Sequence, residues 1–365
     1  MHHLYVHVPF CVRRCSYCDF SIAVRKRIPA DDYVAAIRVE LESAGSLGPL
    51  ETIYLGGGTP SLLPPEAVAT LLQYVAGHTS SPHAVEVTLE ANPEDVTPDA
   101  ATVWRRAGVN RVSLGAQSFH DPVLRWMHRS HDAGRIGAAV ETLRRAGIDN
   151  VSLDLIFALP RELSRDWSRD LDAALALEPA HLSLYGLTVE PRTPLARWVS
   201  RGAATATDDE RYAEEYLLAH ERLSGAGYAF YEVSNAAREG RRSRHNSAYW
   251  SGRAYLGLGP AAHSFDGRTR RWNLAAWEAY RRALAEGLSP IESEETLTDE
   301  QLKLERMYLG LRTAEGLPSH PPQPLDPLLA RGWMVQDGGR VRCTPEGWLR
   351  LDSLVQALTG SAATS

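Results

Sequence analysis

The chain has 365 residues, of which 44% are hydrophobic and 23% are charged, as in a large globular protein. The net charge of −6 argues against a broad nucleic-acid-binding surface, and no apolar run reaches the roughly 18 residues that cross a bilayer. Four cysteines are too few for a disulfide framework, and the N-terminus lacks the pattern of a secretory signal. We therefore expect a cytoplasmic protein, a monomer or a dimer, that does not bind nucleic acid.

The first 230 residues alternate short strands with helices. Ser164 and the pair Thr207 and Glu210 are expected to start helices, the pair as a capping box. Crossover helices between strands predict a parallel sheet, and we favour a partial (β/α)6 barrel of the TIM type over an open doubly wound sheet. The predicted strands are rich in Val, Ile and Leu, as strands covered by helices should be, and span 4–8, 52–57, 84–90, 111–115, 151–157 and 181–187.

The pattern weakens after residue 230, where aromatic residues and glycine are frequent. A helix is expected from Thr298, followed by a proline-rich connector at 318–327. A hairpin at 333–344, turning at Asp337-Gly338-Gly339, precedes a last helix at about 345–358. The predicted division is a core barrel at 1–230, a connecting region at 231–295, a helical, winged-helix-like module at 296–358 and a loose tail at 359–365.

Three of the four cysteines, Cys11, Cys15 and Cys18, lie in one polar loop directly after the first strand. Loops at the carboxyl ends of barrel strands are where active sites lie. Structural zinc normally takes four ligands, so a zinc site here would need a further residue such as His7. A 4Fe-4S cluster held by three thiolates would instead keep one iron open for an exchangeable ligand. We favour the cluster, with a zinc site and buried structural cysteines as alternatives.

The CxxxCxxC spacing, with the aromatic Tyr17 before the last cysteine, resembles the radical S-adenosylmethionine (SAM) superfamily. In that family the amino and carboxylate groups of SAM chelate the open iron, and the reduced cluster releases a 5′-deoxyadenosyl radical. The resemblance implies a 4Fe-4S cluster and SAM as cofactors. Further motifs agree with it: GGGTP ends the second strand, Glu90 ends the third, and Asp154 lies inside the fifth, where an unpaired acid would be costly.

The segments YVHVPFC, CSYCDF, GGGTP, RVSLGAQSF and SLDLIF together resemble the branch of oxygen-independent coproporphyrinogen III oxidases, across nearly the whole chain. That branch contains the oxidase and the HemW-type heme chaperones. The oxidase has a fourth cysteine where this chain has Phe20, and a longer arm before the cluster motif. RHNSAYW (244–250) matches the HNxxYW motif of the chaperone group. The resemblance favours a heme chaperone, with coproporphyrinogen III oxidation as the alternative.

The resemblance also implies roles for particular residues. Cys11, Cys15 and Cys18 would hold the cluster, and His245 would ligate heme, with His263 as a second candidate. Alternatively, His245 makes internal hydrogen bonds while the nearby aromatic residues pack in the core. The implied partners are heme and a heme-acceptor apoprotein, with room for a transient contact with a membrane-bound acceptor. Contacts to the SAM on the cluster are expected from Tyr5, Gly57 and Glu90. The residues that in the oxidase contact a second SAM, and here are pocket candidates, are Tyr17, Gly58, Thr59, Gln117, Arg129 and Asp154.

Overall fold

The computed structural model describes residues 1–80, 84–319 and 325–359. At its centre is a nine-stranded open sheet with the strand order β11-β1-β4-β5-β6-β7-β8-β10-β9. All six predicted strands are present and neighbouring ones pair in parallel, which confirms the α/β fold class. They are β1 (His3–Val8), β4 (Thr52–Gly57), β5 (Glu86–Ala91), β6 (Arg111–Gln117), β7 (Asn150–Phe157) and β8 (His181–Gly186).

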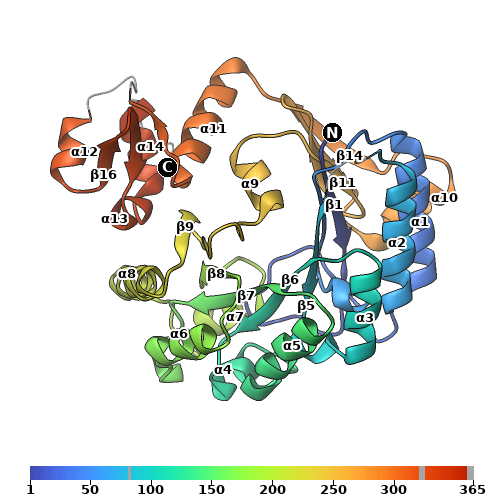
Figure 1. Ribbon diagram of the computed structural model, residues 1–365, viewed down its shortest axis with the longest axis horizontal. Helices are drawn as coiled ribbons and strands as arrows, with labels where there is room; N and C mark the ends of the chain where they lie inside the picture. Colours follow the sequence, from blue (N-terminus) through green and yellow to red (C-terminus); the bar gives the residue numbers. More distant parts are fainter. Residues whose placement is uncertain (81–83, 320–324, 360–365) are drawn as a thin grey trace.

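The sheet is curved, and helices cover its convex, outer face (Figure 1). Side chains alternate along each strand. On β1, Leu4, Val6 and Val8 belong to the main apolar core, whereas Tyr5 and His7 lie on the other face of the strand, toward the inside of the barrel. This arrangement is a partial barrel of the predicted type and needs no closure. The covering helices are α1 (Ala30–Ala44), α2 (Pro65–Gly77), α3 (Pro98–Arg106), α4 (Asp121–Trp126), α5 (Ala133–Arg145), α6 (Trp167–Ala176) and α8 (Asp209–Gly225).

Residues after position 228 extend both edges of the sheet. β10 (Asn235–Ala237) pairs antiparallel with β8 and with β9 (Ala229–Glu232), whereas β11 (Leu256–Leu258) pairs parallel with β1. Between them lies α9 (Arg244–Trp250), which carries the HNxxYW segment. A second, antiparallel sheet consists of β12 (His263–Phe265), β13 (Thr269–Asn273) and β14 (Ile291–Thr296). Between β13 and β14 lies α10 (Trp277–Ala285), which packs against α1.

The C-terminal module stands beside the barrel (Figure 1). Its first helix, α11 (Asp299–Arg312), starts at a capping box of Thr298 and Gln301, as the predicted start at Thr298 requires. The predicted hairpin is confirmed as β16 (Met334–Asp337) and β17 (Arg340–Cys343), and β15 (Leu317–Pro318) joins it. Further helices are α12 (Asp326–Ala330), α13 (Pro345–Trp348) and α14 (Leu351–Thr359), so the single last helix that we predicted is two. The connector at 320–324 and the tail beyond 359 lie outside the described residues.

Two predicted helix starts were wrong. Asp208, not Thr207, caps α8: its carboxylate accepts from the backbone N–H of Arg211 at 2.8 Å. The Thr207 hydroxyl instead donates to the carbonyl of Ala158, in the loop after β7. Likewise Asp166, not Ser164, caps α6. In each case an aspartate just after the predicted residue caps the helix, because a carboxylate accepts strongly from the free N–H groups at a helix N-terminus. The hydrogen bond to Ala158 also holds Thr207 away from that position.

No helix in the described part of the chain combines the length and apolar character needed to cross a membrane.

Candidate functional site

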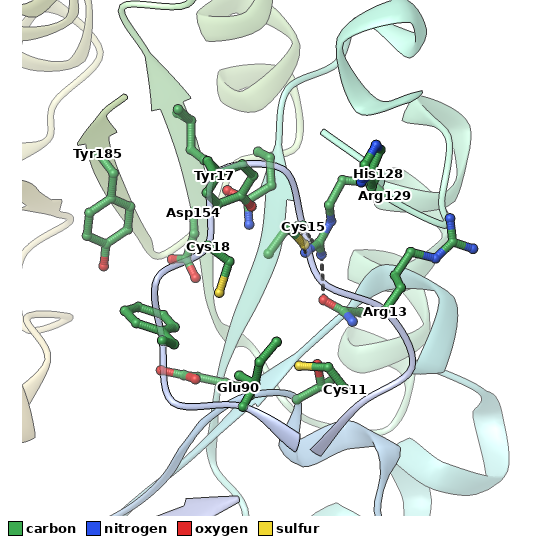
Figure 2. Close-up of a pocket in the computed structure, with 18 of the residues that line it drawn as sticks. Cys11, Arg13, Cys15, Tyr17, Cys18, Glu90, His128, Arg129, Asp154 and Tyr185 are labelled. Carbon is green, nitrogen blue, oxygen red and sulfur yellow. Dashed lines mark hydrogen bonds between the residues drawn. The ribbon is translucent and has the colours of Figure 1, made fainter. Parts of the chain in front are cut away.

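A cavity of about 390 Å³ lies at the carboxyl ends of the parallel strands (Figure 2), within the usual range of roughly 300–1,000 Å³ for ligand pockets. Parallel strands bring their carboxyl ends to one edge, so motifs far apart in the sequence meet there. Eleven of the predicted site residues line the cavity: Cys11, Cys15, Tyr17, Cys18, Gly57, Gly58, Thr59, Glu90, Gln117, Arg129 and Asp154.

The loop that carries the three cysteines is held by two hydrogen bonds between backbone groups and one from an arginine side chain. The N–H of Cys18 donates to the carbonyl of Cys15 at 3.3 Å, and the Arg14 guanidinium donates to the carbonyl of Cys18 at 3.0 Å. The N–H of Ser16 donates to the carbonyl of Met127 at 3.2 Å, which ties the loop to the end of α4. None of the three cysteines forms a disulfide, and Figure 2 shows the thiols of Cys11 and Cys18 directed into the space that the loop surrounds.

The donor set fits an iron–sulfur cluster better than a single zinc ion. In the described residues no three His, Cys, Asp or Glu side chains converge as the ligands of one metal ion would. His7 is engaged: its Nδ1 lies 3.1 Å from the Tyr5 hydroxyl, and its Nε2 lies 3.2 Å from the carbonyl of Ser21. Burial raises the pKa of the Cys11 thiol, and it raises the pKa of Cys18 to about 11. Bound iron would supply the positive charge that converts such thiols to thiolates.

Arg129 places a positive charge beside the cysteine loop. One nitrogen, Nη1, lies 3.6 Å from the Cys15 sulfur, while Nη2 donates to the carbonyl of Gly115 at 3.0 Å and to the Asn92 side chain. Its Nε is buried and has no partner among the described residues. Two fixed oxygens therefore orient this guanidinium toward the Cys15 sulfur, where its charge would stabilise a negatively charged group.

Glu90 holds a carboxylate at the wall of the cavity in a fixed orientation. Its Oε1 accepts from the Tyr54 hydroxyl at 2.7 Å, and its Oε2 accepts from the backbone N–H of Gly57 at 3.0 Å. Burial outweighs these hydrogen bonds and raises the pKa of Glu90 to about 7. A carboxylate in this position can accept hydrogen bonds from a ligand's hydroxyl groups once it has lost its proton.

Asp154 lies inside β7 and is paired, as a buried acid in a strand must be. The Ser113 hydroxyl donates to both of its oxygens, at 3.0 and 3.1 Å, and the Ser152 hydroxyl donates at 3.3 Å. Burial is the main cause of its raised pKa. Asp154 thus adds a second carboxyl group to the same cavity.

The GGGTP turn needs glycine because it packs closely against residues 7–10, which directly precede Cys11. A Cβ at Gly57, whose φ is +114°, would lie 2.6 Å from the His7 ring, and one at Gly58 would lie 2.8 Å from the carbonyl oxygen of Phe10. The next residue, Thr59, places its hydroxyl 3.3 Å from the Cys11 sulfur. The turn therefore brings backbone groups at the end of β4 close to the loop that carries the three cysteines.

Tyr5 and His245 lie outside the cavity lining. Tyr5 is behind the cavity wall, stacked on Tyr54 with ring centroids 6.0 Å apart. His245 is buried in α9; its Nδ1 lies 2.7 Å from the Thr52 hydroxyl and its Nε2 lies 2.8 Å from the Tyr249 hydroxyl. Neither ring nitrogen is available to iron in this conformation. His263 is exposed on β12, with its ring stacked on Trp272.

Several residues of the site were not predicted. Asn92 orients Arg129, Tyr54 orients Glu90, and Tyr185 lines the cavity with 47% of its side chain exposed. One sequence signal was available for the serines: a Ser-Leu dipeptide recurs at 113–114, 152–153 and 183–184. In each pair the leucine joins the apolar core, whereas Ser113 and Ser152 are in register and both reach Asp154.

The curved parallel sheet and the three thiols at its carboxyl edge define a radical SAM protein. In agreement, residues 5–174 match the Radical SAM superfamily. The chain is 40% identical to the heme chaperone HemW of Mycobacterium tuberculosis over 368 residues, which covers 98% of this chain and 94% of that protein. It is 35% identical to the heme chaperone HemW of Bacillus subtilis, covering 86% of this chain and 84% of that protein. The chain belongs to the HemW family of the radical SAM superfamily.

The fold is also similar to a solved structure. Coproporphyrinogen III oxidase (HemN) from Escherichia coli superposes with a TM-score of 0.84 at 21% identity, covering 98% of this chain and 90% of that one. At that identity the similarity concerns the fold.

Proposed function

We propose that this protein binds heme and transfers it to an acceptor protein, and that it carries a 4Fe-4S cluster with SAM bound to the open iron. The observation that carries the proposal is the 40% identity, over 98% of the chain, to a protein named heme chaperone. Phe20 supports it, since it occupies the position of the oxidase's fourth cysteine. With 61% of its side chain exposed at the cavity, Phe20 offers apolar surface to a flat ligand.

Each predicted residue has a place in this proposal. Cys11, Cys15 and Cys18 hold the cluster, and Arg129 balances its negative charge. Gly57 and Glu90 contact the SAM, while Tyr5 supports that contact from behind the wall. The cluster supplies an electron to SAM when both are bound; the chain's own residues bind, orient and exclude water. The remaining pocket residues, whether or not they meet a second SAM, are Tyr17, Gly58, Thr59, Gln117 and Asp154.

The place of heme binding is a separate part of the proposal. His245 stays a prediction as a heme ligand, and ligation would require its hydrogen bond to Thr52 or to Tyr249 to break. The acceptor is a heme-binding apoprotein, soluble or held at a membrane, and we place the exchange in the cytoplasm.

Heme titration tests the chaperone function. Protein reconstituted anaerobically with iron and sulfide should bind heme saturably, with a Soret band that moves to an apo-acceptor when the two are mixed. A Cys343→Ala variant should behave like the wild type, because this thiol lies in β17 of the C-terminal module and not in the loop that carries the other three cysteines. Protein that takes up no heme would refute the proposal.

The competing function is oxidation of coproporphyrinogen III, which the HemN-like fold allows. The same reconstituted protein, given SAM, a reductant and coproporphyrinogen III, should form no protoporphyrinogen. Conversion of that substrate would overturn the chaperone proposal in favour of the oxidase.

A further inference from the structure

The HNxxYW helix closes the barrel at the end opposite to the cavity. His245 contacts Thr52, the first residue of β4, whereas Gly57, the last residue of the same strand, lines the cavity. The N-terminus of α9 is fixed by Glu86, the first residue of β5, whose carboxylate accepts from the backbone N–H groups of Arg244 and His245, each at 3.0 Å. The helix is therefore packed into the barrel floor through its buried residues, His245 and Ala248.

From this floor a continuous set of contacts runs to the cavity. The His245 ring stacks on Tyr54, with centroids 5.0 Å apart and planes 28° apart. Tyr54 donates its hydroxyl to Glu90 at 2.7 Å, and the other Glu90 oxygen accepts from the N–H of Gly57 at 3.0 Å. Tyr5, from β1, also stacks on Tyr54, with ring centroids 6.0 Å apart, and its ring lies 6.4 Å from that of His245. The three rings form one cluster, so the Tyr54 ring has aromatic support from two elements.

We infer that His245 is a positioning residue for SAM: it fixes the Tyr54 ring, and Tyr54 in turn orients the Glu90 carboxylate. This inference rests on the proposed contact between Glu90 and SAM. A carboxylate that meets a ligand works only in the correct orientation, and that orientation is set by the groups behind it. Glu90 has one donor on each oxygen, so removal of the Tyr54 hydroxyl or displacement of its ring would let the carboxylate rotate.

The contacts around α9 favour this role over heme ligation. Both His245 nitrogens are bonded within the protein, and α11 packs on the helix from the side of the C-terminal module. The Arg312 guanidinium lies 4.2 Å from the centroid of Trp250 and pairs with Glu232 at 2.7 Å, which holds the end of α9 in place. Heme could reach the imidazole only if this packing opened.

Two variants and a control test the inference. Tyr54→Phe removes only the hydroxyl, and His245→Gln removes the stacked ring while keeping polar groups near Thr52 and Tyr249. Tyr228→Phe is the control, because its buried hydroxyl bonds the carbonyl of Pro179 in another part of the barrel. For each reconstituted protein, the SAM dissociation constant would be measured by equilibrium dialysis, and heme uptake by the Soret band, after iron content and circular dichroism show an intact barrel.

We expect Tyr54→Phe, which removes one hydrogen bond to the Glu90 carboxylate, to weaken SAM binding about tenfold. His245→Gln, which removes the ring that fixes Tyr54, should weaken SAM binding by a similar factor. The double variant should be little worse than either single variant, because both act on the same carboxylate. Heme affinity and the Soret position should not change, and Tyr228→Phe should match the wild type.

Other results would overturn the inference. It is wrong if His245→Gln alters the Soret band while SAM binding stays normal, since that result identifies a heme ligand. It is also wrong if Tyr54→Phe leaves SAM binding unchanged, a test that holds even where His245→Gln does not fold. Wild-type protein that binds SAM but no heme would instead refute the proposed chaperone function and leave the role of His245 standing.

Discussion

The raised pKa of Glu90 leads us to predict that SAM binding depends on pH. Without ligand, burial keeps the pKa of this carboxyl group at about 7, so that lowering the pH from 8 to 6 protonates most of the population. The ribose hydroxyls of SAM donate hydrogen bonds and its sulfonium is positive, so the ionised form of Glu90 should be the one that binds. SAM binding should therefore release a proton below pH 7 and weaken as the pH falls.

The size of the effect follows from the pKa. With a pKa of about 7, the ionised fraction is about 0.9 at pH 8 and about 0.1 at pH 6. The apparent dissociation constant equals the intrinsic constant divided by the ionised fraction. It should therefore rise about tenfold when the pH is lowered from 8 to 6. Glu90→Gln should bind SAM more weakly at every pH, but with a flat profile, because its side chain does not titrate.

Calorimetry at pH 6, 7 and 8, in two buffers with different ionisation enthalpies, would measure both the affinity and the protons released. Asp95→Asn is a matched control: burial raises the pKa of Asp95 to about 6, but its carboxylate bonds Ser61 and does not line the cavity. It should keep the wild-type profile. The reasoning fails if the wild type binds SAM equally well at pH 6 and 8, or if Glu90→Gln retains the tenfold change.

The remaining predictions concern the cluster, the barrel and the module. Cys11→Ala should lose most of the cluster iron, measured by iron analysis after anaerobic reconstitution, whereas Cys343→Ala should retain it. Arg129→Lys should lower the free energy of unfolding by about 2–3 kcal/mol in urea titrations, because one ammonium group cannot reach the oxygens of Asn92 and Gly115 and also the Cys15 sulfur. Trp348→Ala should destabilise the module by about 3–5 kcal/mol and speed its proteolysis, because this buried side chain bonds the carbonyl of Leu311 in α11. Asp208→Ala should cost about 1 kcal/mol of stability through loss of the α8 cap, and unchanged thermal unfolding would contradict that assignment.

The strands that were predicted and those that were not differ in a physical way. β4 to β8 place Val, Ile or Leu at every second position because helices cover one face of the sheet, and this alternation is visible in the sequence. β9, β10 and β11 are four, three and three residues long, too short for any periodicity. Their pairing depends on where the chain returns after α8 and after α9, which local sequence does not specify. The same holds for the cap at Asp208, since only the contact of Thr207 with Ala158 shows why the threonine is not used.

By itself, the sequence determined the chemistry of the site: which residues are thiols, which turn must be glycine, and which strands end in an acid. Because parallel strands share an edge at their carboxyl ends, the spacing of those motifs along the chain was enough to place them in one cavity. Only the tertiary structure decided what lies behind that cavity. The HNxxYW segment looks like a ligand motif when read as a string, yet packing buries its histidine in the barrel floor, where Thr52 and Tyr249 bond both ring nitrogens and Tyr54 covers one face.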